Sequence, residues 1–143
     1  MPETLGLLAG VVDIYMPDMK FGFGKAAALC AQAPDYPEVN FSAVQEMHRQ
    51  TGALVTDQQG IAVRGLLVRH LVLPEDLAGT AAVMKFISEE IGQDTYVNIM
   101  DQYYPCHDAV GHPVLGRRIS SEEFSRALET ARNFGLTRLL QKE

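Results

Sequence analysis

Polar side chains that could bind a ligand follow or end three apolar segments of this chain. Each segment is predicted to be a buried parallel strand, and ligands of α/β proteins lie at the carboxyl ends of such strands. An acid, two cations and hydrogen-bonding side chains suit a ligand with hydroxyl groups and a carboxylate or phosphate. The candidate binding residues are Asp18 and Lys20 after the first segment, Arg69 and His70 in the second, and Asp101, Gln102 and Tyr103 after the third.

Ordinary structural explanations compete with this reading. Asp18 and Lys20 could form a weak ion pair in a surface turn, worth at most about 1 kcal/mol. Arg69 could pack its stem and extend its head to solvent, beside a core His70 whose hydrogen bonds are satisfied. The residue types and their spacing leave both explanations open.

The two cysteines, Cys30 and Cys106, lie 76 positions apart and form no CxxC pair. We expect two reduced thiols of a cytoplasmic protein. A metal site formed by Cys106, His107, His112 and Asp101 is an alternative, but its spacing matches no common pattern of metal ligands. We therefore assign no residue to a metal, and none to a catalytic role.

The segment that positions Arg69 and His70 is a near-continuous apolar run at 65–74, bounded by Gly65 and Pro74. Such a run predicts a buried strand of a parallel sheet. The pattern predicts further strands at 11–16, 95–100 and 136–140, and a hairpin within 53–63 that turns at Gly60. Helices are expected at 1–9, 24–33, 35–50 and 77–91, and from a capping box at Ser120 to Gly135.

These elements alternate along the chain, which predicts an α/β fold with a parallel sheet and outer helices. The 143 residues fit a single domain, 1–143. A net charge of −6 without a Lys/Arg stripe argues against nucleic acid as a partner. No apolar stretch approaches the roughly 20 residues that span a bilayer, and no secretory signal is visible, so we expect no membrane partner and a cytoplasmic location.

Five segments together resemble the carboxyl-terminal part of radical S-adenosylmethionine proteins. Within that superfamily, the pyruvate formate-lyase activating enzyme-like proteins are the most similar group, and the resemblance covers nearly the whole chain. The segments are VVDIYMPDMKF at 11–21, APDYPEV at 33–39, EMHRQTG at 46–52, GLLVRHLVLP at 65–74 and TYVNIMDQYYP at 95–105.

The resemblance implies a partial TIM-type barrel and an iron–sulfur oxidoreductase. In that family a CxxxCxxC loop binds a [4Fe–4S] cluster, whose unique iron is chelated by S-adenosylmethionine. Reductive cleavage of S-adenosylmethionine then gives a 5′-deoxyadenosyl radical, and in the activating enzymes this radical abstracts hydrogen from a glycine of a protein substrate.

Residue by residue, the resemblance implies a partial S-adenosylmethionine site. Asp18 and Lys20 match a D-x-K at the end of the family's fourth strand, which contacts the ribose and the methionine part. Arg69 matches an arginine near the cofactor. Tyr103 falls where the activating enzymes carry a histidine, so Gln102 and Tyr103 are expected only to line the pocket.

The chain departs from the family in having no CxxxCxxC motif and too few cysteines to form one. We therefore expect the carboxyl-terminal part of a longer barrel, which needs its amino-terminal half for the cluster. The inner sheet face would be bare and would pair with that half or self-associate. The alternatives are a non-catalytic α/β binding or interaction module that assembles through the exposed sheet, and a small enzyme that uses Asp18, Lys20 and His70 as acid–base groups.

Overall fold

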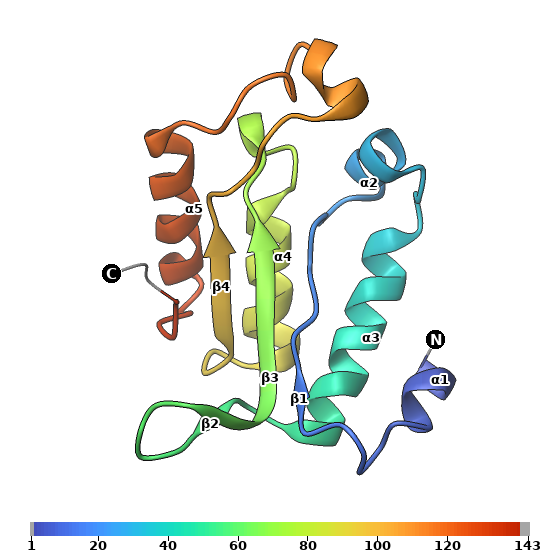
Figure 1. Cartoon of the computed structure of the whole chain (residues 1–143), viewed down its shortest axis with the longest axis vertical. Coiled ribbons are helices and arrows are strands. Elements are labelled where there is room, and N and C mark those ends of the chain that lie inside the picture. The colour runs from blue at the N-terminus through green and yellow to red at the C-terminus, as the bar shows by residue number, and fades with distance from the viewer. Residues whose placement is uncertain (1, 141–143) are drawn as a thin grey trace.

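The chain forms a mixed α/β structure around one long central strand, as Figure 1 shows for the computed structural model, which describes residues 2–140. Within these residues there are five α-helices and a four-stranded sheet. The central strand β3 (Ala62–Leu71) pairs in parallel with β1 (Ile14–Tyr15) and with β4 (Tyr96–Met100). The short strand β2 (Val55–Thr56) pairs antiparallel with the beginning of β3. The α/β class expected from the sequence is thus confirmed.

The predicted strand at 65–74 is β3, which begins three residues earlier, at Ala62, and ends at Leu71. The strand predicted at 11–16 is regular only at Ile14 and Tyr15, but the chain continues alongside β3 beyond that point. Arg69 N donates to Pro17 O at 2.9 Å, and Met19 N donates to Arg69 O at 2.8 Å. The extended segment therefore delivers residues 18–20 to the carboxyl end of the sheet.

The hairpin predicted within 53–63 is confirmed, with Gly60 in a positive-φ conformation at 80°. Asp57 Oδ1 stabilises its turn by accepting hydrogen bonds from the backbone N–H groups of Gln59 and Ile61, both at 2.9 Å. This turn returns the chain into β3.

Four of the predicted helices form close to the expected residues. Gly52, with φ 74°, ends the third helix as predicted. The capping box predicted at Ser120 is present, since the Ser120 side chain accepts from Glu123 N and the Glu123 carboxylate accepts from Ser120 N. These helices are α1 (Pro2–Gly6), α2 (Gly24–Ala31), α3 (Tyr36–Thr51) and α5 (Ser121–Asn133).

The helix predicted at 77–91 begins three residues later than expected and changes type before its end. It consists of α4 (Thr80–Phe86) and a π-helical turn, Ile87–Ile91, and a separate 3-10 turn, Pro74–Asp76, precedes it. Gly79, with φ 70°, separates the first turn from α4, and Gly92 ends the last turn. The helix begins only at Thr80 because the left-handed backbone conformation at Gly79 is not helical.

The main core lies on one face of the sheet, between the strands and the helices α3, α4 and α5. In Figure 1, α4 lies behind the strands, and α3 and α5 flank it. Alternate residues of β3 and β4 enter this core because side chains alternate between the two faces of a strand. The fully buried residues include Leu66, Val68 and Val97 from the sheet, Val44 from α3, Val83 and Met84 from α4, and Ala131 from α5.

The other face of the sheet carries no helix among residues 2–140 (Figure 1). Ile14 and Met16 on this face are 39% and 55% exposed. The strand predicted at 136–140 is reduced to an isolated bridge, Leu139 with Val97, and residues 141–143 lie outside the described part. The sheet described here is open, and barrel closure is not part of the observed fold.

Within residues 2–140, no helix combines the length and the apolar character needed to cross a bilayer.

Candidate functional site

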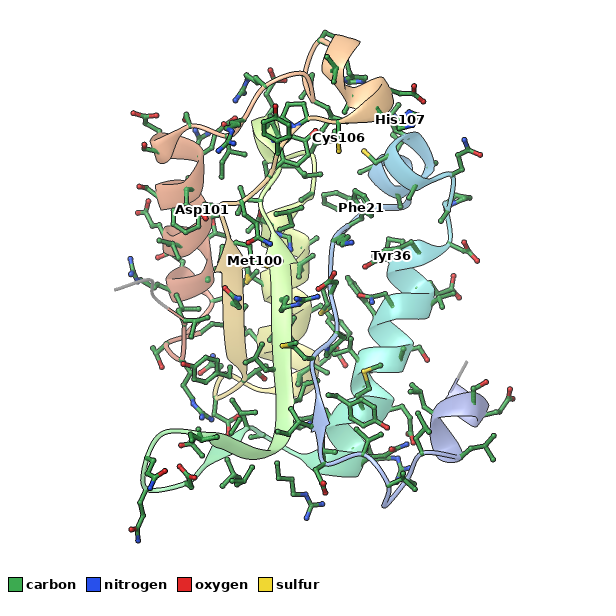
Figure 2. All side chains as sticks on the ribbon, in the orientation of Figure 1. Phe21, Tyr36, Met100, Asp101, Cys106 and His107 are labelled. Carbon is green, nitrogen blue, oxygen red and sulfur yellow. The ribbon has the colours of Figure 1, made fainter. Side chains whose placement is uncertain are left out.

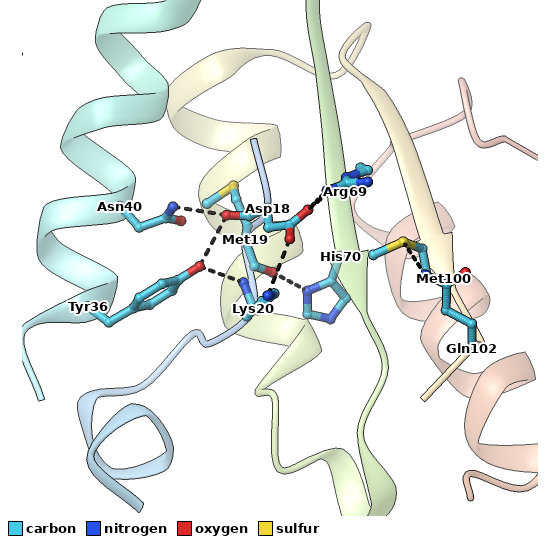
Figure 3. A network of polar contacts seen from close by, with 9 residues as sticks. All are labelled: Asp18, Met19, Lys20, Tyr36, Asn40, Arg69, His70, Met100 and Gln102. Atoms are coloured by element: carbon cyan, nitrogen blue, oxygen red, sulfur yellow. Dashed lines mark hydrogen bonds and ion pairs between the residues drawn. The ribbon is translucent and has the colours of Figure 1, made fainter. Parts of the chain in front are cut away.

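A cluster of three charged side chains lies on the open face at the carboxyl ends of β1 and β3 (Figure 3). Asp18 Oδ1 accepts a hydrogen bond from Arg69 Nε at 2.7 Å and forms an ion pair with Arg69 Nη2, also at 2.7 Å. Asp18 Oδ2 lies 3.4 Å from Lys20 Nζ. This contact shows that Asp18 and Lys20 point the same way, and Arg69 joins them from the neighbouring strand.

The cluster combines one carboxylate with two cations, which leaves one excess positive charge. The side chains are only partly covered, with exposed fractions of 26% for Asp18, 35% for Arg69 and 48% for Lys20. Their polar atoms are therefore accessible to a ligand on the open face. In a protein with a net charge of −6, this is a local site that suits an anionic group.

Two side chains of α3 hold the backbone beneath the cluster. The Tyr36 hydroxyl accepts from Lys20 N at 3.0 Å and donates to Asp18 O at 3.1 Å. Asn40 Nδ2 donates to the same carbonyl at 3.0 Å. Burial, the largest cause, raises the pKa of Tyr36, so its hydroxyl stays protonated and available as a donor. Tyr36 and Asn40 were missed by the sequence analysis because only the packing of α3 against β1 brings them here.

His70 lies behind the sheet and is fully buried. Its Nδ1 lies 2.7 Å from Met19 O, and its Nε2 lies 3.1 Å from Thr80 Oγ1. A carbonyl can only accept, so Nδ1 carries the proton and Nε2 accepts from the Thr80 hydroxyl. Burial is the main cause that lowers the pKa of His70, which keeps the ring neutral.

Adjacent residues of a strand face opposite sides, so Arg69 reaches the open face while His70 enters the core. His70, which the sequence analysis placed among the binding residues, therefore reaches the site only through the Met19 carbonyl. The geometry corresponds to the structural alternative stated above, a core histidine whose hydrogen bonds are satisfied within the protein. Because His70 lies on the opposite face of the sheet, it is not placed to act with Asp18 and Lys20 in acid–base chemistry.

Gln102 and Tyr103 are separated from each other by the structure. Gln102 is exposed, lies 3.7 Å from Met100 Sδ (Figure 3), and lines a cavity of about 380 Å³ between β4 and α5. The Tyr103 hydroxyl donates to Leu115 O at 2.9 Å, and its ring lines a pocket of about 220 Å³ together with Lys20. Of these two predicted residues, only Tyr103 shares a pocket with the charged cluster.

The two cysteines also meet at this end of the molecule. Both are free thiols, and both line a cavity of about 450 Å³ between α2 and the loop that carries Cys106 and His107 (Figure 2). Burial raises the pKa of Cys30. Across residues 2–140, no three His, Cys, Asp or Glu side chains gather closely enough to hold a metal ion, so Asp101, Cys106, His107 and His112 do not form the alternative metal site.

The chain is similar to an uncharacterized protein of Methanocaldococcus jannaschii. The two are 33% identical over 135 residues, which cover 94% of this chain and 36% of that protein. No family model matches the chain, and no solved structure matches it significantly. The chain thus spans little more than a third of the length of the curated relative that it matches.

Proposed function

We propose that this chain is the carboxyl-terminal part of a radical S-adenosylmethionine, iron–sulfur protein of the activating-enzyme type. In this proposal its strands are the last strands of a partial TIM-type barrel. The protein acts as a cytoplasmic oxidoreductase, and a glycine-bearing protein is a possible substrate. The chain contributes part of the S-adenosylmethionine site, and a separate amino-terminal region supplies the cluster.

The observation that carries this proposal is the position of the Asp18–Lys20–Arg69 cluster. It lies at the carboxyl ends of two neighbouring parallel strands, on the face that the helices leave open. Barrel enzymes place their ligands at this end of their strands. The resemblance of the five sequence segments is the second support.

The chemistry of the cluster fits S-adenosylmethionine. A carboxylate such as Asp18 accepts hydrogen bonds from ribose hydroxyls, and the cations Lys20 and Arg69 pair with the methionine carboxylate. When bound at these three side chains, S-adenosylmethionine would supply the radical chemistry of the family. The [4Fe–4S] cluster itself does not fit this chain, because the sequence has only two cysteines.

The edge of β1 is where the rest of the barrel would attach in this proposal. Among residues 2–140, β1 pairs with β3 alone. Beside it, Asn40 Oδ1 is buried and has no hydrogen-bond partner in the described part of the chain. A buried acceptor of this kind costs free energy unless a donor reaches it.

Titration calorimetry with S-adenosylhomocysteine, a stable analogue, tests the proposal. Asp18→Asn and Arg69→Lys should each weaken binding about tenfold or more, because each disrupts a charge-assisted contact. Arg49→Lys is the matched control, since Arg49 forms a comparable pair with Glu46 on the outside of α3, at 2.7 Å. Unchanged affinity in Asp18→Asn and Arg69→Lys would contradict the assignment of the cluster.

A second candidate function is an interaction module that assembles through the open sheet face. The exposure of Ile14 and Met16 beside the charged cluster favours it. This candidate predicts association of the chain and no binding of the analogue, so the same calorimetry separates the two functions.

A further inference from the structure

A mostly apolar pocket adjoins the charged cluster and shares Lys20 with it. It lies at the carboxyl end of the sheet, between α2 and the loop that follows β4, and its volume is about 220 Å³. Lys20 is the charged residue of its lining. Its walls include Phe21, Leu71, Leu73, Tyr103 and Leu115.

The walls of this pocket are fixed by packing and hydrogen bonding. Phe21, Leu73 and Leu115 belong to a second small core. The Tyr103 hydroxyl, which donates to Leu115 O, ties the two ends of the loop together. Phe21 also packs edge-to-face against Tyr36, with ring centroids 5.4 Å apart (Figure 2). The pocket is therefore held open by the fold itself.

The size and the lining of the pocket define what it accepts. At about 220 Å³ it is larger than the cavity of about 150 Å³ that binds benzene in a protein core. An aromatic ring or a branched aliphatic group fits this volume. Its charged lining residue, Lys20, shares the carboxylate of Asp18 with Arg69, which leaves one positive charge for an anion.

We propose that this pocket is a binding site for a small carboxylic acid with an aromatic or branched apolar body. The apolar body lies against Leu71, Leu73 and Leu115, and the carboxylate pairs with the Lys20 ammonium. This inference rests on the pocket and on its charge and does not require the proposed cofactor, with which the pocket shares Lys20.

The test uses 3-phenylpropionate as the probe, with methyl-labelled protein followed by nuclear magnetic resonance. Addition of the probe should shift the methyl signals of Leu71, Leu73 and Leu115. The uncharged 3-phenylpropan-1-ol should bind about two- to fivefold more weakly, which is the effect of a partly exposed ion pair. Lys20→Met should abolish this preference for the carboxylate.

Pocket-filling variants test the location. Ala109→Phe places a ring in the pocket from the loop, and Cys30→Leu narrows it from α2. Each should weaken 3-phenylpropionate binding, Ala109→Phe by about tenfold or more, since the probe and the new side chain compete for one volume. Val110→Phe is the matched control, because Val110 is 65% exposed on the same turn and does not line the pocket.

Two results would overturn the inference. The first is equal binding of the acid and the alcohol, and the second is full affinity in folded Ala109→Phe and Cys30→Leu. Competition between 3-phenylpropionate and S-adenosylhomocysteine is the expected result, because both carboxylates pair with Lys20. Failure of S-adenosylhomocysteine to bind would count only against the proposed cofactor.

Discussion

At the scale of single residues, the charged cluster depends on a neutral histidine behind the sheet. His70 joins the Met19 carbonyl to the Thr80 hydroxyl, and Met19 lies between Asp18 and Lys20 in the chain. Thr80 N in turn donates to Asp76 Oδ1 at 2.8 Å. The ring therefore connects the end of β1 to the beginning of α4, and it does so only while Nε2 is unprotonated.

The pH dependence of stability follows from the pKa of His70. Burial lowers this pKa below its ordinary value of 6.5, so the unfolded chain binds a proton there before the folded chain does. The contribution of His70 to the free energy of unfolding is thus complete above pH 6.5 and is lost as the pH falls below it. In His70→Leu this loss of stability at low pH should disappear. The slope of the free energy of unfolding against pH should then be smaller by up to about 1.4 kcal/mol per pH unit.

Urea unfolding between pH 5 and pH 8 measures this effect. At pH 8, His70→Leu should itself be less stable by about 1–3 kcal/mol, because the Met19 carbonyl and the Thr80 hydroxyl lose their partner. His107→Gln is the control, since the His107 side chain is 96% exposed and makes no contact with Met19 or Thr80. Parallel profiles for wild type and His70→Leu would show that His70 does not carry the effect.

At the scale of elements, Gly65 is the junction at which three segments meet. Gly65 N donates to Asp13 O at 2.9 Å, in the segment that leads into β1. The next residue donates from Leu66 N to Gly52 O, just after α3, at 3.0 Å. Gly65 has φ 117°, and a Cβ atom built on it would lie 2.3 Å from Ala53 O. Only glycine satisfies both the conformation and the space at this position.

Gly65→Ala should therefore lower the free energy of unfolding by at least about 2 kcal/mol, through backbone strain and the clash with Ala53. Gly60→Ala should cost only about 1 kcal/mol, because Gly60 has φ 80° but no atom near the added methyl group. Chemical denaturation of the two variants measures the difference. Equal losses would mean that the close approach to Ala53 relaxes without cost.

At the scale of the whole molecule, one sheet face is covered and the other is open. The open face combines the charged cluster with the exposed side chains of Ile14 and Met16. Exposed apolar side chains favour contact with another protein surface, because burial of apolar surface stabilises by about 25 cal/mol per Å². We therefore expect either the rest of a barrel or a second copy of the chain on this face.

Sedimentation equilibrium tests this expectation at the level of the isolated chain. The wild type should self-associate in a concentration-dependent manner, and Met16→Glu should shift it toward monomer, because a carboxylate on the open face resists burial. Leu7→Glu is the control, since Leu7 is 81% exposed and lies next to α1, away from the sheet. A monomeric wild type that unfolds cooperatively would contradict self-association through this face.

Some of this structure was determined by the sequence itself, because it depends on neighbours in the chain. Hydrophobic runs define β3 and β4, Ser120 and Glu123 define the start of α5, and Gly52 ends α3. The shared direction of Asp18 and Lys20 follows from the two-residue period of an extended chain. These features need no knowledge of distant residues.

The tertiary structure decided which residues meet at the site. Arg69 and Asp18 are 51 positions apart, and so are His70 and Met19. A shift of one residue between β1 and β3 would exchange the faces that Arg69 and His70 occupy, and no local pattern specifies that register. The support by Tyr36 and Asn40, the pocket shared by Lys20 and Tyr103, and the burial of His70 all arise from long-range packing, which places side chains that the sequence keeps far apart.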